Sequence, residues 1–143
     1  MSEYIILMLN DSVPVKVTDV NLKTLETLIN KPESIAVRIG KKSMVKNLIA
    51  VVVKMEAVAE AVDRNLKIVV RDTAFFTSAQ SDAILDSLTN DINKKAFALV
   101  NDEILINRGC YQYAEYDDKI VVENEVEQEE KNIANEEETQ ADA

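Results

Sequence analysis

Two tyrosines and one arginine lie close together in the chain, and they have the residue types and spacing of a recognition surface. Tyr111 and Tyr113 are two positions apart, so both rings share one face of a regular β-strand. Tyr116 then falls on the opposite face. An exposed tyrosine pair beside Arg108 can stack nucleic-acid bases or anchor a protein partner. The alternative is that the rings cover a core, because strands favour aromatic side chains for packing alone.

Basic residues next to two predicted turns form a second candidate surface. They are Lys41, Lys42 and Lys46 around the first turn, and Lys94 and Lys95 before the closing strands of the second half. Such clusters can contact an anion or a phosphate backbone. The alternative is solubilising charge on exposed loops. An internal repeat would place the two clusters at corresponding corners of the molecule.

The residue types that are missing argue against most catalytic and cofactor chemistry. The chain has no histidine, one cysteine and two glycines. Zinc sites need several Cys or His ligands, and phosphate-binding loops need closely spaced glycines. We therefore expect no enzyme activity and no cofactor. A carboxylate-only Mg²⁺ site at Asp102/Glu103 or Asp117/Asp118 is the alternative, and Cys110 is expected to be a small buried hydrophobe.

Most of the net charge of −10 lies at the C-terminal end. Residues 1–118 hold 14 Lys/Arg against 17 Asp/Glu, whereas residues 119–143 hold 2 against 9. We expect residues 123–143 to be disordered. The segment can solubilise the protein, dock on a basic partner, or fold back on the chain's own lysines. It resembles the acidic tails of many single-stranded DNA-binding proteins in charge, although residues 140–143 lack their aromatic tip.

Hydrophobic patterning predicts one helix among four strands in the first half of the chain. The strands are expected at 4–9, 13–17, 35–39 and 45–55. A helix over 19–30 is indicated by Leu22, Leu25 and Ile29 at helical spacing, with Thr18 or Asp19 as its cap. Residues 43–64 stay ambiguous, since they can form one long helix or a strand to about residue 55 followed by a short helix.

The second half repeats this order about 59 residues later. Strands are expected at 66–71, 74–76, 95–100, 104–106 and 111–116, with a last one at 120–122. A helix over 78–91 follows Thr77 and Gln80, which have the spacing of a capping box. Thr77 lies 59 residues after Thr18, and Leu88 lies 59 after Ile29. Chance similarity is the alternative to duplication, because ββαββ strings are common in small α+β proteins.

These patterns predict an α+β fold of two pseudo-repeated ββαββ units packed as one compact domain, with a disordered acidic C-terminal tail. The units are expected at 1–55 and 66–122, joined by a linker helix at 56–65 and followed by the tail at 123–143. The single cysteine and the absence of a signal sequence or a long apolar run favour the cytoplasm and no membrane contact.

The function expected from the sequence is a non-catalytic protein-binding regulator or inhibitor. Its size, acidity and missing motifs are typical of accessory proteins of phages and mobile elements. The alternative is a single-stranded nucleic-acid-binding protein with an acidic regulatory C-terminal tail. The candidate surface for either partner consists of Lys41, Lys42, Lys46, Lys94, Lys95, Arg108, Tyr111 and Tyr113.

Overall fold

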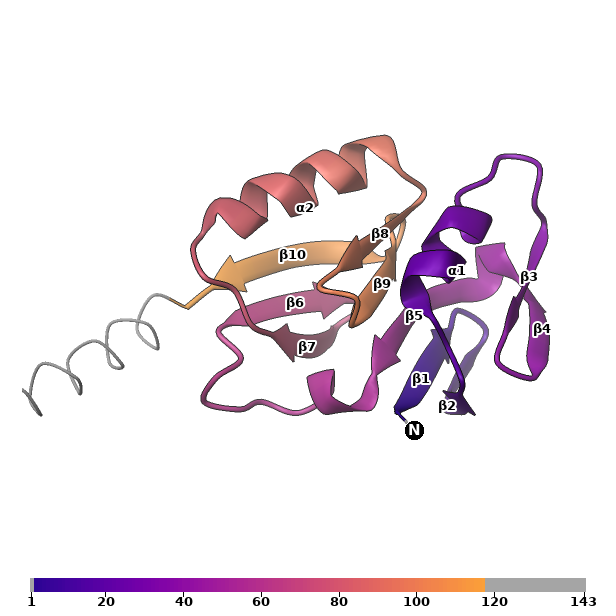
Figure 1. Cartoon of the computed structure of the whole chain (residues 1–143), viewed down its shortest axis with the longest axis horizontal. Helices are drawn as coiled ribbons and strands as arrows, with labels where there is room; N and C mark the ends of the chain where they lie inside the picture. Colours follow the sequence, from indigo (N-terminus) through magenta and orange to yellow (C-terminus); the bar gives the residue numbers. More distant parts are fainter. Residues whose placement is uncertain (1, 118–143) are drawn as a thin grey trace, which may run out of the picture.

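The computed structural model describes residues 2–117, which form a mixed α+β fold. Ten strands lie in three sheets, and two α-helices pack against them (Figure 1). The α+β class is therefore confirmed. The predicted strand at 120–122 and the acidic segment at 123–143 lie outside the described residues. No helix within 2–117 is long and apolar enough to cross a membrane.

The two halves of the described chain have the same order of strands and helix. The first half contains β1 (Glu3–Met8), β2 (Asp11–Thr18), α1 (Leu22–Ile29), β3 (Ala36–Ile39), β4 (Lys42–Val45) and β5 (Ile49–Lys54). The second half contains β6 (Leu66–Val70), β7 (Thr73–Thr77), α2 (Ala83–Lys94), β8 (Phe97–Val100), β9 (Ile104–Asn107) and β10 (Tyr111–Tyr116). The first half thus has one strand more than the sequence predicts, since the expected strand at 45–55 is interrupted by the 3-10 turn η1 (Lys46–Leu48). The five described strands of the second half match in number those expected within 66–116.

The sheets do not follow the boundary between the halves. The largest sheet has the order β2-β1-β5-β9-β8, so the β8–β9 hairpin of the second half extends the sheet of the first half. A three-stranded sheet has the order β10-β6-β7, and β3 and β4 form a separate two-stranded sheet. All of these pairings are antiparallel.

The five-stranded sheet is buried on both faces, which explains the unbroken apolar run of β5. Val52 packs with Ile29 under α1, whereas Val51 and Val53 face the opposite core with Leu88 of α2. All three valines have no solvent exposure. Because side chains alternate along a strand, a sheet between two cores needs apolar residues at every position. We call these two clusters the α1 core and the α2 core.

This burial decides the ambiguity at residues 43–64. A strand continues to Lys54, so the alternative of one long helix is wrong. The predicted linker helix at 56–65 is limited to the single 3-10 turn η2 (Met55–Ala57), and the following residues contain no helix. Ala57 is fully buried in the α2 core, which favours a tight turn packed on the sheets over an exposed helix.

Both helices begin later than the sequence predicts, because their expected caps have other roles. Asp19 has a φ of 58°, and the side chain of Asn21 caps α1 by accepting the Thr24 amide at 3.1 Å. Thr77 is the last residue of β7, and its hydroxyl donates to the Glu103 carboxylate. The expected capping box therefore does not form, and α2 starts at Ala83.

Candidate functional site

Strand β10 carries Tyr111, Tyr113 and Tyr116 and lies at the edge of its sheet. The pairing of β10 with β6 shifts between Tyr111 and Tyr113, so the intervening Gln112 forms a bulge. Tyr111 and Tyr116 consequently pack against the α2 core, whereas Tyr113 points to solvent with 48% of its surface exposed. The expectation that Tyr111 and Tyr113 share a face is therefore wrong, because it assumed a regular strand.

The exposed Tyr113 ring lies beside a cation. The ammonium of Lys67, on the neighbouring strand β6, is 5.8 Å from the centre of this ring, within the range of a cation–π contact. Burial raises the pKa of the Tyr111 hydroxyl, which fits its position over the core. Only one of the two tyrosine rings is thus presented to a partner.

Backbone geometry makes the outer side of β10 an open strand edge. The amide of Asp117 donates to the Asn65 carbonyl at 2.7 Å, so Asp117 points towards β6. Antiparallel strands alternate, so Glu115 and Tyr113 also bond towards β6, while the backbone groups of Ala114 and Tyr116 point outward. Within residues 2–117, no strand pairs with this outer side.

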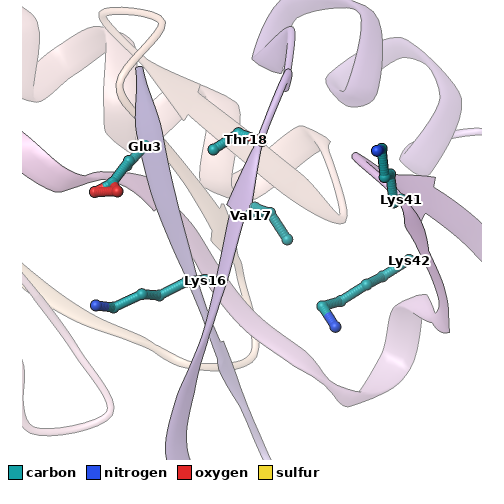
Figure 2. Close-up of a pocket in the computed structure, with 6 residues that line it drawn as sticks. All are labelled: Glu3, Lys16, Val17, Thr18, Lys41 and Lys42. Carbon is teal, nitrogen blue, oxygen red and sulfur yellow. The ribbon is translucent and has the colours of Figure 1, made fainter. Parts of the chain in front are cut away.

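The lysines at the β3–β4 turn are free to contact a partner. Lys41 and Lys42 line a shallow hollow together with Glu3, Lys16 and Thr18. Figure 2 shows the ammonium groups of Lys16 and Lys42 on opposite sides of β2, so they do not converge on one point. The hollow therefore lacks the focused positive charge of a built anion site.

Two of the other candidate lysines are already bound within the fold. Lys46 Nζ donates to the carbonyls of Ile29 at 3.0 Å and Lys31 at 2.9 Å, so it completes the C-terminal end of α1. Lys95 Nζ lies 3.1 Å from Glu26, and this hydrogen bond raises the pKa of Lys95. The ammonium group of Lys46 is therefore not available without breaking these contacts, whereas the side chain of Lys95 stays 42% exposed.

The two basic clusters do not occupy corresponding corners. Lys41 and Lys42 lie at the β3–β4 turn, whereas Lys94 ends α2 and Lys95 precedes β8 (Figure 1). The turn that matches β3–β4 in the second half is the β8–β9 turn, which carries Asp102 and Glu103 in place of lysines. The expected symmetric placement of basic residues is therefore wrong. Arg108 is exposed in the turn after β9, and its amide donates to the Ala96 carbonyl at 2.9 Å, so the fold brings it beside Lys95.

A polar network that the sequence did not indicate connects β7, the β8–β9 turn and the segment before β6. Arg64 binds Glu103 through two nitrogen–oxygen contacts of 3.0 and 3.3 Å, and it also donates to the Phe76 carbonyl at 3.0 Å. Burial raises the pKa of Glu103, but the hydrogen bonds from Arg64 and Thr77 outweigh it and lower that pKa overall. Glu103 was a candidate magnesium ligand, and its hydrogen bonds to Arg64 and Thr77 give it a structural role instead.

The described residues hold no metal-binding cluster. Within residues 2–117, no three Cys, His, Asp or Glu side chains lie close enough together to hold a metal ion. Cys110 is buried, and burial raises the pKa of its thiol despite the nearby charge of Arg71. A thiol in this environment is a poor nucleophile.

Comparison of the chain with protein-family models, with curated proteins and with solved structures found no match.

Proposed function

We propose that this chain is a non-catalytic protein-binding module, a regulator or inhibitor of a larger assembly, which binds by adding a strand to the open edge of β10. The observation that carries this proposal is the outward orientation of the backbone groups of Ala114 and Tyr116 at a sheet edge. An added strand would gain affinity from main-chain hydrogen bonds and specificity from alternate side chains.

The exposed side chain of Tyr113 is a second feature that supports partner binding at β10. Its ring is large, amphipathic and half exposed, which is the character of residues that dominate binding energy at protein interfaces. The chain's lack of histidine and of glycine-rich loops favours binding over catalysis. An accessory role in a phage or mobile element would suit such a module.

The test is affinity capture from the source cells, using the full chain and two proline variants. Ala114→Pro removes an amide that points away from β6, so it blocks the β10 edge without breaking a bond of its own sheet. Ala74→Pro is the matched control, because Ala74 lies on the opposite edge strand β7 and its backbone also points outward.

We expect Ala114→Pro to lose the captured partner and Ala74→Pro to keep it, with both variants melting within a few degrees of the parent. Equal capture by the parent and Ala114→Pro would contradict the proposal, whatever the identity of the captured protein.

We also propose that the two halves arose by duplication of one ββαβββ unit. The support is that β1 pairs with β2 and β5, as β6 pairs with β7 and β10, and that each half contains a further hairpin, β3–β4 or β8–β9. Relatives with a single unit, or with two halves of higher mutual identity, would be the test of this history.

Single-stranded nucleic-acid binding is the second candidate, and the exposed Tyr113 ring beside Lys67 is the observation in its favour. It requires that Tyr113→Ala weaken oligonucleotide binding in a low-salt anisotropy assay, with the exposed Leu28→Ala as a control for folding. Absence of binding by both the full chain and a chain lacking residues 123–143 would exclude it.

A further inference from the structure

Within residues 2–117, only two pairs of corresponding strands differ in their number of neighbours. The central strands β1 and β6 each pair with two strands, and β2, β3, β7 and β8 each pair with one. In contrast, β5 has two neighbours while its counterpart β10 has one, and β9 has two while its counterpart β4 has one. The missing pairing is the one that β5 and β9 make with each other.

We infer that the chain associates head to tail with further copies of itself, through antiparallel pairing of β10 in one copy with β4 of the next. This inference rests on the proposed function, because it names the strand that occupies the β10 edge. The contact would repeat between two chains what the β5–β9 pairing does within one.

The correspondence of β5 with β10 follows from their pairing with the central strands. Val52 lies opposite Ile6 in the first half, and Ala114 lies opposite Ile68 in the second. Ile6 and Ile68 are themselves equivalent, since each faces the core beneath the helix of its own half and lies two residues before the pair nearest its hairpin turn, Met8 with Asp11 or Val70 with Thr73. Ala114 therefore holds the position in β10 that Val52 holds in β5.

The correspondence of β4 with β9 follows in the same way from the two hairpins. The pair nearest the turn is Ile39 with Lys42 in the first hairpin and Val100 with Ile104 in the second. Lys42 is thus the counterpart of Ile104, and Ser43 is the counterpart of Leu105.

These two correspondences fix the register of the inferred pairing. Within the chain, Val52 lies opposite Leu105 and Val53 lies opposite Ile104. The equivalent contact between two copies places Ala114 opposite Ser43. It also places Glu115 opposite Lys42.

On both edges, the residues whose backbone groups point outward are the ones that this register requires. Lys54 donates to the Glu103 carbonyl at 2.8 Å, so Val52 also bonds towards β9, and its counterpart Ala114 points outward from β6. On the other edge, Lys46 donates to the Ile35 carbonyl at 3.0 Å. Met44 therefore bonds towards β3, and the backbone groups of Ser43 point outward to meet those of Ala114.

Charge supports the same register. Glu115 and Lys42 are both exposed, and the inferred pairing sets them directly opposite each other. Opposite charges at such a cross-strand position are stabilising, and like charges are destabilising. The pairing within the chain uses Val53 and Ile104 at these two positions, which are buried in the α2 core.

Because the contact joins two different strands, a single contact leaves β4 of one copy and β10 of the other without a partner from another chain. Every copy that uses β10 still offers β4 to another copy. Head-to-tail contacts of this kind produce a ring if the rotation between copies closes, and an open filament if it does not.

The first experiment measures the mass of the full chain by light scattering and sedimentation across a wide range of concentration. We expect oligomers that grow with concentration. Lys42→Glu and Glu115→Lys should each weaken association about threefold to tenfold, and an equimolar mixture of the two variants should regain mixed pairs. Lys94→Glu is the matched control, since Lys94 is exposed but lies outside both strands.

The second experiment tests the register by disulfide trapping. Positions 42 and 115 would form a non-hydrogen-bonded pair with Cα atoms about 4.5 Å apart, which suits a disulfide. A mixture of Lys42→Cys and Glu115→Cys chains should yield a linked heterodimer under mild oxidation. Gln112→Cys, on the same strand but out of register, should not link to Lys42→Cys, and the parent chain provides the blank because its Cys110 is buried.

A chain that stays monomeric at every concentration, or that links equally well through position 112, would overturn the inference. A monomer whose capture of another protein still depends on Ala114 would overturn self-association alone and leave the proposed function standing. Capture that is indifferent to Ala114→Pro would overturn the proposed function, whatever the oligomeric state.

Discussion

Asn30 and Phe97 join the two halves of the protein through a pair of hydrogen bonds. The Asn30 Oδ1 accepts the Phe97 amide at 2.8 Å, and its Nδ2 donates to the Phe97 carbonyl at 2.9 Å. Asn30 follows α1 of the first half, whereas Phe97 opens β8 of the second. The Asn30 side chain thereby satisfies both backbone groups of Phe97, which lies on a strand at the edge of the sheet.

Removing this side chain should destabilise the fold. We expect Asn30→Ala to lower the free energy of unfolding by about 2 kcal/mol, because two partly buried hydrogen bonds are lost and the Phe97 backbone is left unpaired. Urea unfolding followed by circular dichroism measures the change. Asn93→Ala is the matched control near the end of α2, where the side chain is exposed, and a comparable loss in that variant would contradict this explanation.

The Arg64–Glu103 pair should affect stability mainly because removing one partner leaves the charge of the other largely buried and uncompensated. The two side chains are only 16% and 18% exposed, so Arg64→Ala would leave a largely buried carboxylate without its main partner. We expect a loss of about 2–3 kcal/mol for Arg64→Ala, and a smaller loss for the double variant Arg64→Met/Glu103→Leu. A double variant that is less stable than Arg64→Ala would contradict this account.

Glu103 should also make stability depend on pH. Its pKa in the folded protein is lowered from the ordinary value of 4.5, because the bonds from Arg64 and Thr77 outweigh burial. Its contribution is therefore complete above the unfolded pKa and is lost as the pH falls through the lower, folded value. The difference in urea midpoint between the parent and Glu103→Gln should be constant near neutral pH and shrink below about pH 4.5. A difference that is unchanged down to pH 2 would show that the charge of Glu103 is not responsible.

Gly40 should not tolerate a side chain. Its φ is +61°, and a Cβ at this position would lie 2.7 Å from the carbonyl oxygen of Thr18. We expect Gly40→Ala to cost about 2 kcal/mol in the free energy of unfolding, from backbone strain and from this close contact. Gly109→Ala is the control, since its Cβ would meet only Asn107 Oδ1 at 3.4 Å and its φ is ordinary. Equal stability of the two variants in a thermal melt would contradict the prediction.

The sequence predicts those parts of the structure that depend on local periodicity. Leu22, Leu25 and Ile29 recur at helical spacing because one face of α1 is buried, and the buried side of that helix is the one that they form. The strands at the start of each half are recognisable for a similar reason, since their apolar runs are too short for helices and are bounded by turn residues. The α+β class follows from these elements alone.

The start of α2 and the bulge could not be predicted, because each depends on a partner far away in the sequence. Thr77 has the spacing of a helix cap, but Glu103 in the β8–β9 turn offers the Thr77 hydroxyl a charged acceptor, and this tertiary contact prevails. Gln112 looks like an ordinary strand residue. Its side chain instead accepts the Asp72 amide and donates to the Asp72 carboxylate at 2.9 Å, while the strand bulges at this residue and turns Tyr111 and Tyr113 to opposite faces.

By itself, the order of apolar and turn residues determined which segments of this protein become strands and helices, because that order reflects short-range backbone preference and the period of burial. The tertiary structure alone decided which strands become neighbours. Sheet pairing is satisfied by any edge with matching backbone phase, so nothing local in β9 shows that it joins β5 of the other half. Within residues 2–117, β10 and β4 each pair with one strand only, and the proposed binding depends on their open edges.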